Sequence, residues 1–129
     1  MKTAATIAVF CAGGGLTRYY LSGWIYSLFG RSFPFGTFAV NIIGAYLIGF
    51  VMELGLSSSI IPGMLRLGLT VGFMGGLTTF STFSYETFKL LEEGQFVVAF
   101  TNILGSVAVC LLFTWLGIFT VRSITQGGL

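Results

Sequence analysis

Four long apolar segments, separated by short polar connectors, make up almost all of this 129-residue chain. Hydrophobic residues account for 55% of the sequence and charged residues for only 8%, whereas a soluble domain has about 25% charged residues. A chain of this length cannot bury so much apolar surface away from water. The sequence therefore predicts an all-α membrane protein whose solvent is lipid.

Glycine, proline and charged residues divide the chain into four predicted transmembrane helices, which together form a single domain covering residues 1–129. Each segment can supply the roughly 20 residues that a helix needs to cross about 30 Å of hydrocarbon. The connectors are short, so we expect all chemistry in or across the membrane, in a multi-pass protein of the cell inner (plasma) membrane. The predicted spans are residues 3–28, 35–56, 60–91 and 96–121.

Composition disfavours several other classes of protein. The sequence has no histidine and no cluster of carboxylates, which argues against a zinc or di-iron site. Its two cysteines, Cys11 and Cys110, both lie in apolar segments and are interpreted as small buried residues rather than a disulfide. The net charge of +2 is spread thinly and gives no sign of nucleic-acid binding. We expect no enzyme activity and no nucleic-acid partner.

The basic residues near the helix ends are divided evenly between the two sides of the predicted bundle. The positive-inside rule orients a helical protein by an excess of lysine and arginine in its cytoplasmic loops, and this chain has no such excess. Either a small chain simply has a weak bias, or it inserts in both orientations and pairs as an antiparallel homodimer. The side with both termini has Lys2, Arg66 and Arg122, and the other has Arg31, Lys89 and, if its side chain extends that way, Arg18.

Small and polar residues recur every four positions in three of the predicted helices. Ridges of small residues let helix backbones approach closely, and close packing is our interpretation of the glycines. The polar stripe of the fourth span is either a solvated, ion-lining track or a set of interhelical hydrogen bonds, since serine and threonine can also satisfy their own backbone. The sets are the glycine ridge Gly68, Gly72 and Gly76, the second-span ridge Asn41, Ala45 and Gly49, and the polar stripe Asn102, Ser106, Cys110 and Thr114.

Two ionisable residues lie well inside apolar segments, Arg18 in the first and Glu86 in the third. Such residues are functional candidates by default, because a charge at membrane depth is costly. The alternative is that Arg18 and Glu86 only pair with each other.

The third span contains the stretch GGLTT, Gly75–Thr79, which is a poor helix. Each glycine costs about 1 kcal/mol relative to alanine, and the hydroxyls compete for backbone hydrogen bonds. Irregular backbone survives at membrane depth only where protein or a cavity surrounds it. A break here frees carbonyl oxygens, which coordinate small cations in transporters. The next half-helix is expected to begin near Thr79, and its N-terminus favours an anion.

Phe80 and Phe83 follow the break and share one face of the second half-helix. A phenyl ring has a positive edge, so it can contact an anion without any fixed positive charge. Ordinary core packing is the alternative in a chain with 14 phenylalanines. The neighbouring hydroxyls, including Ser81 and Thr82, favour an uncharged anion path.

The segment Gly72–Glu86, GFMGGLTTFSTFSYE, resembles the signature of the Fluc/CrcB fluoride channels. Gly36–Gly49 and Gly13–Ser22 also resemble that family, so the resemblance covers nearly the whole chain in order. It implies an antiparallel, dual-topology homodimer of four-helix subunits with two fluoride pathways, each lined by both subunits. It also implies a channel that exports fluoride passively and lowers the cytoplasmic fluoride concentration.

The same resemblance implies particular roles for residues of this chain. A sodium ion would lie at the dimer centre, held by the backbone carbonyls of Gly75 and Thr78. Arg18 matches the basic residue of the first helix and Glu86 the carboxylate that ends the motif. Two positions depart from the pattern: residue 110, commonly serine, is Cys110, and residue 102, often aromatic or another polar type, is Asn102. The fluoride pathway would include Asn41, Phe80, Phe83, Ser106 and Thr114, with Ser81 and Thr82 nearby and Asn102 and Cys110 completing the track.

Two rival functions fit the sequence less well than a fluoride channel. A small dual-topology multidrug or cation exporter generally needs a membrane-embedded carboxylate in its first helix, and the first span has none, only Arg18. A membrane scaffold without transport leaves the polar stripe and the broken helix unexplained.

Overall fold

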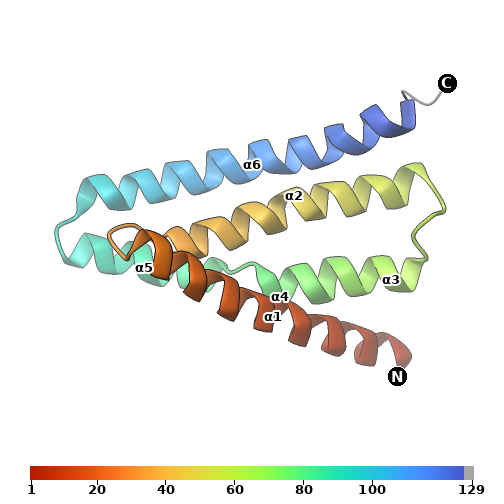
Figure 1. Cartoon of the computed structure of the whole chain (residues 1–129), viewed down its shortest axis with the longest axis horizontal. Coiled ribbons are helices and arrows are strands. Elements are labelled where there is room, and N and C mark those ends of the chain that lie inside the picture. Colours follow the sequence, from red (N-terminus) through yellow and green to blue (C-terminus); the bar gives the residue numbers. More distant parts are fainter. Residues whose placement is uncertain (127–129) are drawn as a thin grey trace.

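The computed structural model describes residues 1–126, and all of the regular elements in that range are helices. Four helical rods run along the long axis of the molecule, and the third rod is interrupted (Figure 1). The rods are α1 (Lys2–Phe29), α2 (Phe35–Ser57), the interrupted helix formed by α3 (Gly63–Leu67), η1 (Gly68–Met74), α4 (Gly75–Leu77) and α5 (Phe80–Glu92), and α6 (Phe96–Gln126).

The helix ends lie close to the predicted ones. Pro34 and Pro62 are the N-cap residues of α2 and α3, as expected for a residue with a fixed φ and no backbone donor. Gly30 and Gly94 adopt φ of 76° and 75°, which favours glycine at the turns after α1 and α5. The largest difference is in α6, which continues to Gln126 rather than ending at residue 121. The N-terminus and the end of α6 lie at the same end of the molecule (Figure 1).

The glycine ridge packs the third helix directly on α1. A Cβ atom added to Gly76 would overlap the carbonyl oxygen of Cys11. In the opposite direction, a Cβ atom added to Gly14 would overlap the backbone of Phe73. Both sides of this contact therefore depend on glycine, and the interpretation of the ridge as a close-packing surface is confirmed. In the same way, Gly117 of α6 lies against the backbone of α2.

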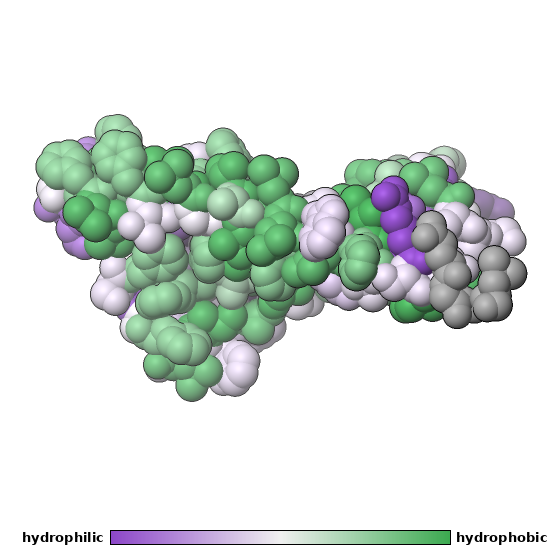
Figure 2. All heavy atoms as spheres, turned by 90° about the horizontal axis from the view of Figure 1, so that it is seen from above, coloured by the Kyte–Doolittle hydropathy of each residue, from purple (hydrophilic) through white to green (hydrophobic). Residues whose placement is uncertain are grey.

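Much of the apolar side-chain surface faces outward. Two helices are long and apolar enough to cross a membrane, α2 and the Phe96–Thr125 part of α6, with mean hydropathy of 1.8 and 2.3. Large apolar side chains such as Leu111 and Trp115 are exposed. Figure 2 shows apolar residues over the middle of one face, with hydrophilic residues nearer its two ends. This distribution suits a helical bundle whose sides are covered by lipid or by another protein rather than by water.

The third helix breaks at Thr78 and Thr79, which have extended backbone (φ −81°, ψ 156° and φ −150°, ψ 115°). The prediction of a broken helix is confirmed, and α5 has Thr79 as its N-cap. The glycines are not the place of the break, because Gly75 is helical (φ −63°, ψ −34°) and Gly76 lies in the contact with α1. The break therefore lies in the threonine half of GGLTT, after a π-helical stretch, η1, that the sequence did not predict.

Candidate ion-conducting groove

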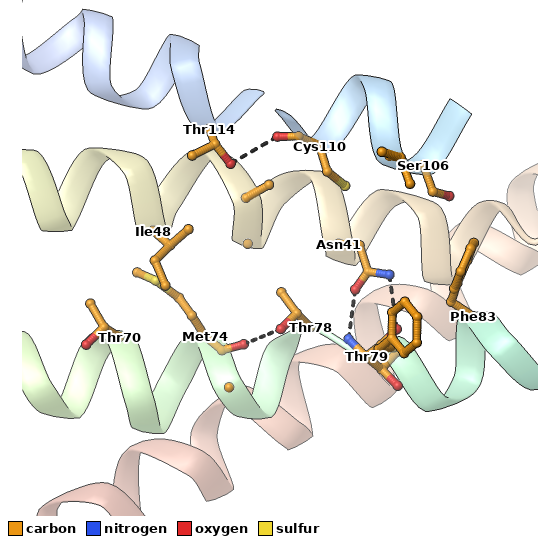
Figure 3. A pocket seen from close by; sticks show the side chains of 15 residues that line it. Asn41, Ile48, Thr70, Met74, Thr78, Thr79, Phe83, Ser106, Cys110 and Thr114 are labelled. Atoms are coloured by element: carbon orange, nitrogen blue, oxygen red, sulfur yellow. Dashed lines mark hydrogen bonds between the residues drawn. The ribbon is translucent and has the colours of Figure 1, made fainter. Parts of the chain in front are cut away.

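A groove of about 450 Å³ lies between α2, the broken third helix and α6. Among residues 1–126, no lysine, arginine, aspartate or glutamate lines it. Gly75 borders its open side, since a Cβ atom added there would meet nothing within 4 Å. Figure 3 shows the side chains that converge on it from these three helices. Its lining includes eight of the predicted site residues: Asn41, Gly75, Thr78, Phe80, Phe83, Ser106, Cys110 and Thr114.

Asn41 holds the break in place through two hydrogen bonds to one residue (Figure 3). Its Oδ1 accepts from the Thr79 backbone N–H at 2.7 Å, and its Nδ2 donates to the Thr79 carbonyl at 3.1 Å. In a continuous α-helix, that N–H would donate to the carbonyl four residues earlier, which belongs to Gly75. The amide of Asn41 therefore takes away the helical donor of the Gly75 carbonyl.

The side chain of Thr79 caps the second half-helix. Its Oγ1 accepts from the Thr82 backbone N–H at 3.1 Å and donates to the Thr82 hydroxyl at 2.9 Å. A threonine at the N-cap satisfies one of the backbone donors that a helix start leaves unpaired. The break is thus fixed by Asn41 from α2 and by Thr79 itself.

The two carbonyls proposed as sodium ligands have different surroundings. The Gly75 carbonyl has lost its helical donor, and Gly75 borders the open side of the groove. The Thr78 carbonyl accepts a hydrogen bond from Nη1 of Arg18 at 3.1 Å. A carbonyl oxygen has two lone pairs, so the guanidinium leaves one of them for another partner. Both oxygens fit a hard cation that binds carbonyl oxygen.

Phe80 and Phe83 lie together beside the break and both line the groove. Their ring centroids are 5.5 Å apart and their planes are tilted by 44°. Phe80 is 78% exposed, although it is one of the most apolar side chains near the break. Its exposure excludes ordinary core packing within a single copy of the chain.

The polar stripe of the fourth span divides into two parts. Ser106, Cys110 and Thr114 line the groove. Asn102 does not line it; it is 1% exposed and donates to the Thr87 hydroxyl of α5 at 2.9 Å. The stripe therefore lines the groove at three positions and makes an interhelical hydrogen bond at Asn102.

Arg18 and Glu86 do not pair with each other. Arg18 binds the Thr78 carbonyl, whereas Oε1 of Glu86 accepts from the hydroxyl of Tyr26 at 2.7 Å. The second carboxylate oxygen of Glu86 is buried and has no hydrogen-bond partner among residues 1–126. The ion pairs found among the described residues, Lys89–Glu92 and Arg122–Glu53, are elsewhere.

Two predicted pathway residues lie outside the groove lining. The side chains of Ser81 and Thr82 are exposed on α5 and do not line the groove. In contrast, Tyr26 and Thr87 make polar contacts that the sequence did not single out. Thr79, which the sequence placed near the start of the second half-helix, is its N-cap. The preference of threonine for N-caps is a local signal for Thr79. Contacts across helices, such as those of Tyr26 and Thr87, have no local signal.

Comparison with known proteins finds a matching family and similar relatives over nearly the whole chain. The family described as CrcB-like protein, Camphor Resistance (CrcB), matches residues 5–118. A relative from Trichlorobacter lovleyi, named fluoride-specific ion channel FluC, is 80% identical over 96% of this chain and 99% of its own length. Relatives of the same name from Pelobacter propionicus and Geotalea uraniireducens are 72% and 61% identical, over 99% and 96% of this chain and 99% and 100% of their own lengths.

Proposed function

The chain belongs to the CrcB-like family, and from this membership we propose that it is a fluoride channel, not an enzyme, through which fluoride leaves the cytoplasm passively. Its action lowers the cytoplasmic fluoride concentration. The observation that carries the proposal is the 80% identity, over nearly all of both chains, to a protein named as a fluoride-specific ion channel. The uncharged groove supports it independently.

Fluoride is small and strongly hydrated, so a pathway must replace its water with hydrogen-bond donors without trapping it. The groove offers donors of this kind and no fixed cation. The amide of Asn41 has two N–H donors, of which one is used on Thr79. The hydroxyls of Ser106 and Thr114, the thiol of Cys110 and the ring edges of Phe80 and Phe83 supply weaker contacts along the groove.

Replacing Phe80 or Phe83 by isoleucine separates a channel from a scaffold without transport. Isoleucine keeps apolar volume but has no positive ring edge, so fluoride release from reconstituted vesicles should fall at least about tenfold, which corresponds to about 1.4 kcal/mol in the barrier. The matched control is Phe88→Ile, because Phe88 lies on the same helix, is 60% exposed and does not line the groove. Unchanged release by both groove variants would contradict the proposed role of the rings.

The proposed assembly is an antiparallel homodimer with two fluoride pathways, in which each groove is closed by the second copy. Three observations support it: the groove is open along Gly75, Phe80 is 78% exposed, and the basic residues are nearly balanced between the two ends. With Arg18 at the break, they are Lys2, Arg66 and Arg122 at one end and Arg31 and Lys89 at the other. Burying such a surface against a second copy removes apolar area that lipid or water would otherwise cover. We place this dimer in the inner membrane as a multi-pass protein.

We further propose that a sodium ion lies at the dimer centre. The Gly75 carbonyl, which lacks its helical donor, and the remaining lone pair of the Thr78 carbonyl would hold it, and its role is structural. Replacing sodium by a large organic cation throughout purification should then lower the dimer fraction measured by gel filtration. An unchanged dimer fraction would argue against a structural ion.

Single cysteines at each end of the chain test the dual topology. In a background with Cys11 and Cys110 replaced by serine, a single cysteine is inserted between Met1 and Lys2, so that no basic residue is lost, or is added after Leu129. Either cysteine should react with a membrane-impermeant thiol reagent from both sides of the membrane. Roughly half of the molecules should be labelled from each side, because the two ends carry nearly equal numbers of lysine and arginine. Labelling from one side alone would rule out the antiparallel dimer.

A further inference from the structure

A chain of three hydrogen bonds leads from the groove into the interior between α5 and α6. Ser106 donates to Oδ1 of Asn102 at 3.2 Å, and Nδ2 of Asn102 donates to the hydroxyl of Thr87 at 2.9 Å. Thr87 in turn donates to the carbonyl of Phe83 at 2.7 Å. Asn102 is 1% exposed, Thr87 6% and Ser106 7%. Of these three side chains, only that of Ser106 lines the groove.

The direction of this chain follows from its inner end. In the structure the Thr87 hydroxyl donates its single proton to the Phe83 carbonyl, which can only accept. Thr87 therefore accepts from the NH₂ group of Asn102, and this fixes the orientation of the Asn102 amide. The amide oxygen then faces Ser106 and takes its proton. Ser106 thus presents lone pairs to the groove, whereas an anion there needs the proton.

Thr114, the other hydroxyl of the polar stripe in the groove, is held differently. Its hydroxyl donates to the Cys110 carbonyl at 3.0 Å, four residues earlier in α6, where the backbone N–H of Thr114 also donates in a regular helix. Thr114 can turn its proton to an anion and leave that carbonyl satisfied. If Ser106 turns, the amide oxygen of Asn102 is left buried without a donor, which is the costly outcome.

We propose that Asn102 is a positioning residue that competes with the passing anion for the single proton of Ser106. It thereby sets how readily fluoride is held at the Phe83 end of the groove. This inference rests on the proposed function, since it assumes that fluoride passes Ser106. Asn102 itself does not touch the ion; it acts through Ser106, whose hydroxyl alternates between the amide oxygen and the anion.

The variant Asn102→Leu tests the competition, because leucine has similar volume and no acceptor. At low fluoride concentration, the initial rate of release from reconstituted vesicles should rise about three- to tenfold, as expected when an acceptor of ordinary hydrogen-bond strength is removed. In a Ser106→Ala background, the same replacement should give no increase. Asn102→Val has the same expected results, and gel filtration checks that each variant is folded.

Two outcomes would overturn the inference: a rate that does not rise in either non-accepting variant, or an equal rise with and without Ser106. A wild-type chain that releases no fluoride would instead overturn the proposed function, so the two failures are distinguishable. The unaltered protein gives a second measurement. Asn41 and Asn102 are the chain's two asparagines, so ¹³C labelling of asparagine gives two side-chain carbonyl signals. The Asn102 signal should shift with fluoride and not with chloride; an unshifted signal would also overturn the inference.

Discussion

Replacing Gly76 by valine should prevent the chain from reaching its folded state. A side chain at this position would overlap the Cys11 carbonyl and lie 2.9 Å from the Gly15 nitrogen. Both obstacles are backbone atoms of α1, so no change of rotamer relieves the overlap. We expect a loss of more than about 3 kcal/mol in the free energy of unfolding, which is the upper end of ordinary overpacking in a core.

The measurement is the yield of monodisperse protein in gel filtration, followed by thermal unfolding in the same detergent. The matched control is Gly23→Ala in α1, because a Cβ atom at Gly23 meets nothing within 4 Å. Alanine there should keep or raise stability, since a helical glycine costs about 1 kcal/mol relative to alanine. Folded Gly76→Val protein with the unfolding temperature of the wild type would show that α1 and the third helix are not packed as described.

The second large effect is expected for Asn41→Leu, which removes both hydrogen bonds to the Thr79 backbone. Thr79 is 7% exposed, so its N–H and carbonyl would be left buried without their side-chain partner. Each such group costs about 1–3 kcal/mol, which gives a loss of about 2–6 kcal/mol in the free energy of unfolding. Fluoride release should also fall at least about tenfold, because the break loses its fixed geometry and the groove loses a donor.

Thr78→Val is the control for stability in the same segment. The Thr78 hydroxyl donates only to the Met74 carbonyl at 2.8 Å, and that carbonyl also accepts from the Thr78 backbone N–H at 2.9 Å. Valine therefore leaves no backbone group unpaired, and the free energy of unfolding should change by less than about 1 kcal/mol. Equal stability of Asn41→Leu and the wild type would contradict the role of Asn41 as the clamp of the break.

The break shows which parts of this fold the sequence can and cannot predict. Poor helix formers at Gly75–Thr79 indicate that the third helix is interrupted, and that prediction is confirmed. They do not locate the interruption, because a glycine in a helix is tolerated where it allows close packing, as Gly76 does against α1. The position depends on Asn41, 38 residues earlier, which competes for the Thr79 N–H. Such a tertiary hydrogen bond has no local pattern.

The candidate site can likewise be predicted only in part from the sequence. Spacing by four places Asn102, Ser106 and Thr114 on one side of a helix, and Ser106 and Thr114 line the groove. The spacing cannot tell which neighbour a given position faces. Asn102 lies where α5 approaches α6 and its amide reaches Thr87, whereas Thr114 lines the groove. Likewise, the depth of Arg18 and Glu86 was predicted, but their partners, Thr78 and Tyr26, follow from packing alone.

The central claim is that an uncharged groove makes this chain a pathway for fluoride in preference to chloride. The most direct measurement loads vesicles that contain the wild-type protein with equal concentrations of the two ions and follows both with ion-selective electrodes. Fluoride should leave rapidly once a counter-ion pathway is opened, while chloride release should stay at the level of protein-free vesicles. The reason is that the groove offers hydrogen-bond donors and no fixed cation. Release of chloride as fast as fluoride, or release of neither, would contradict the claim.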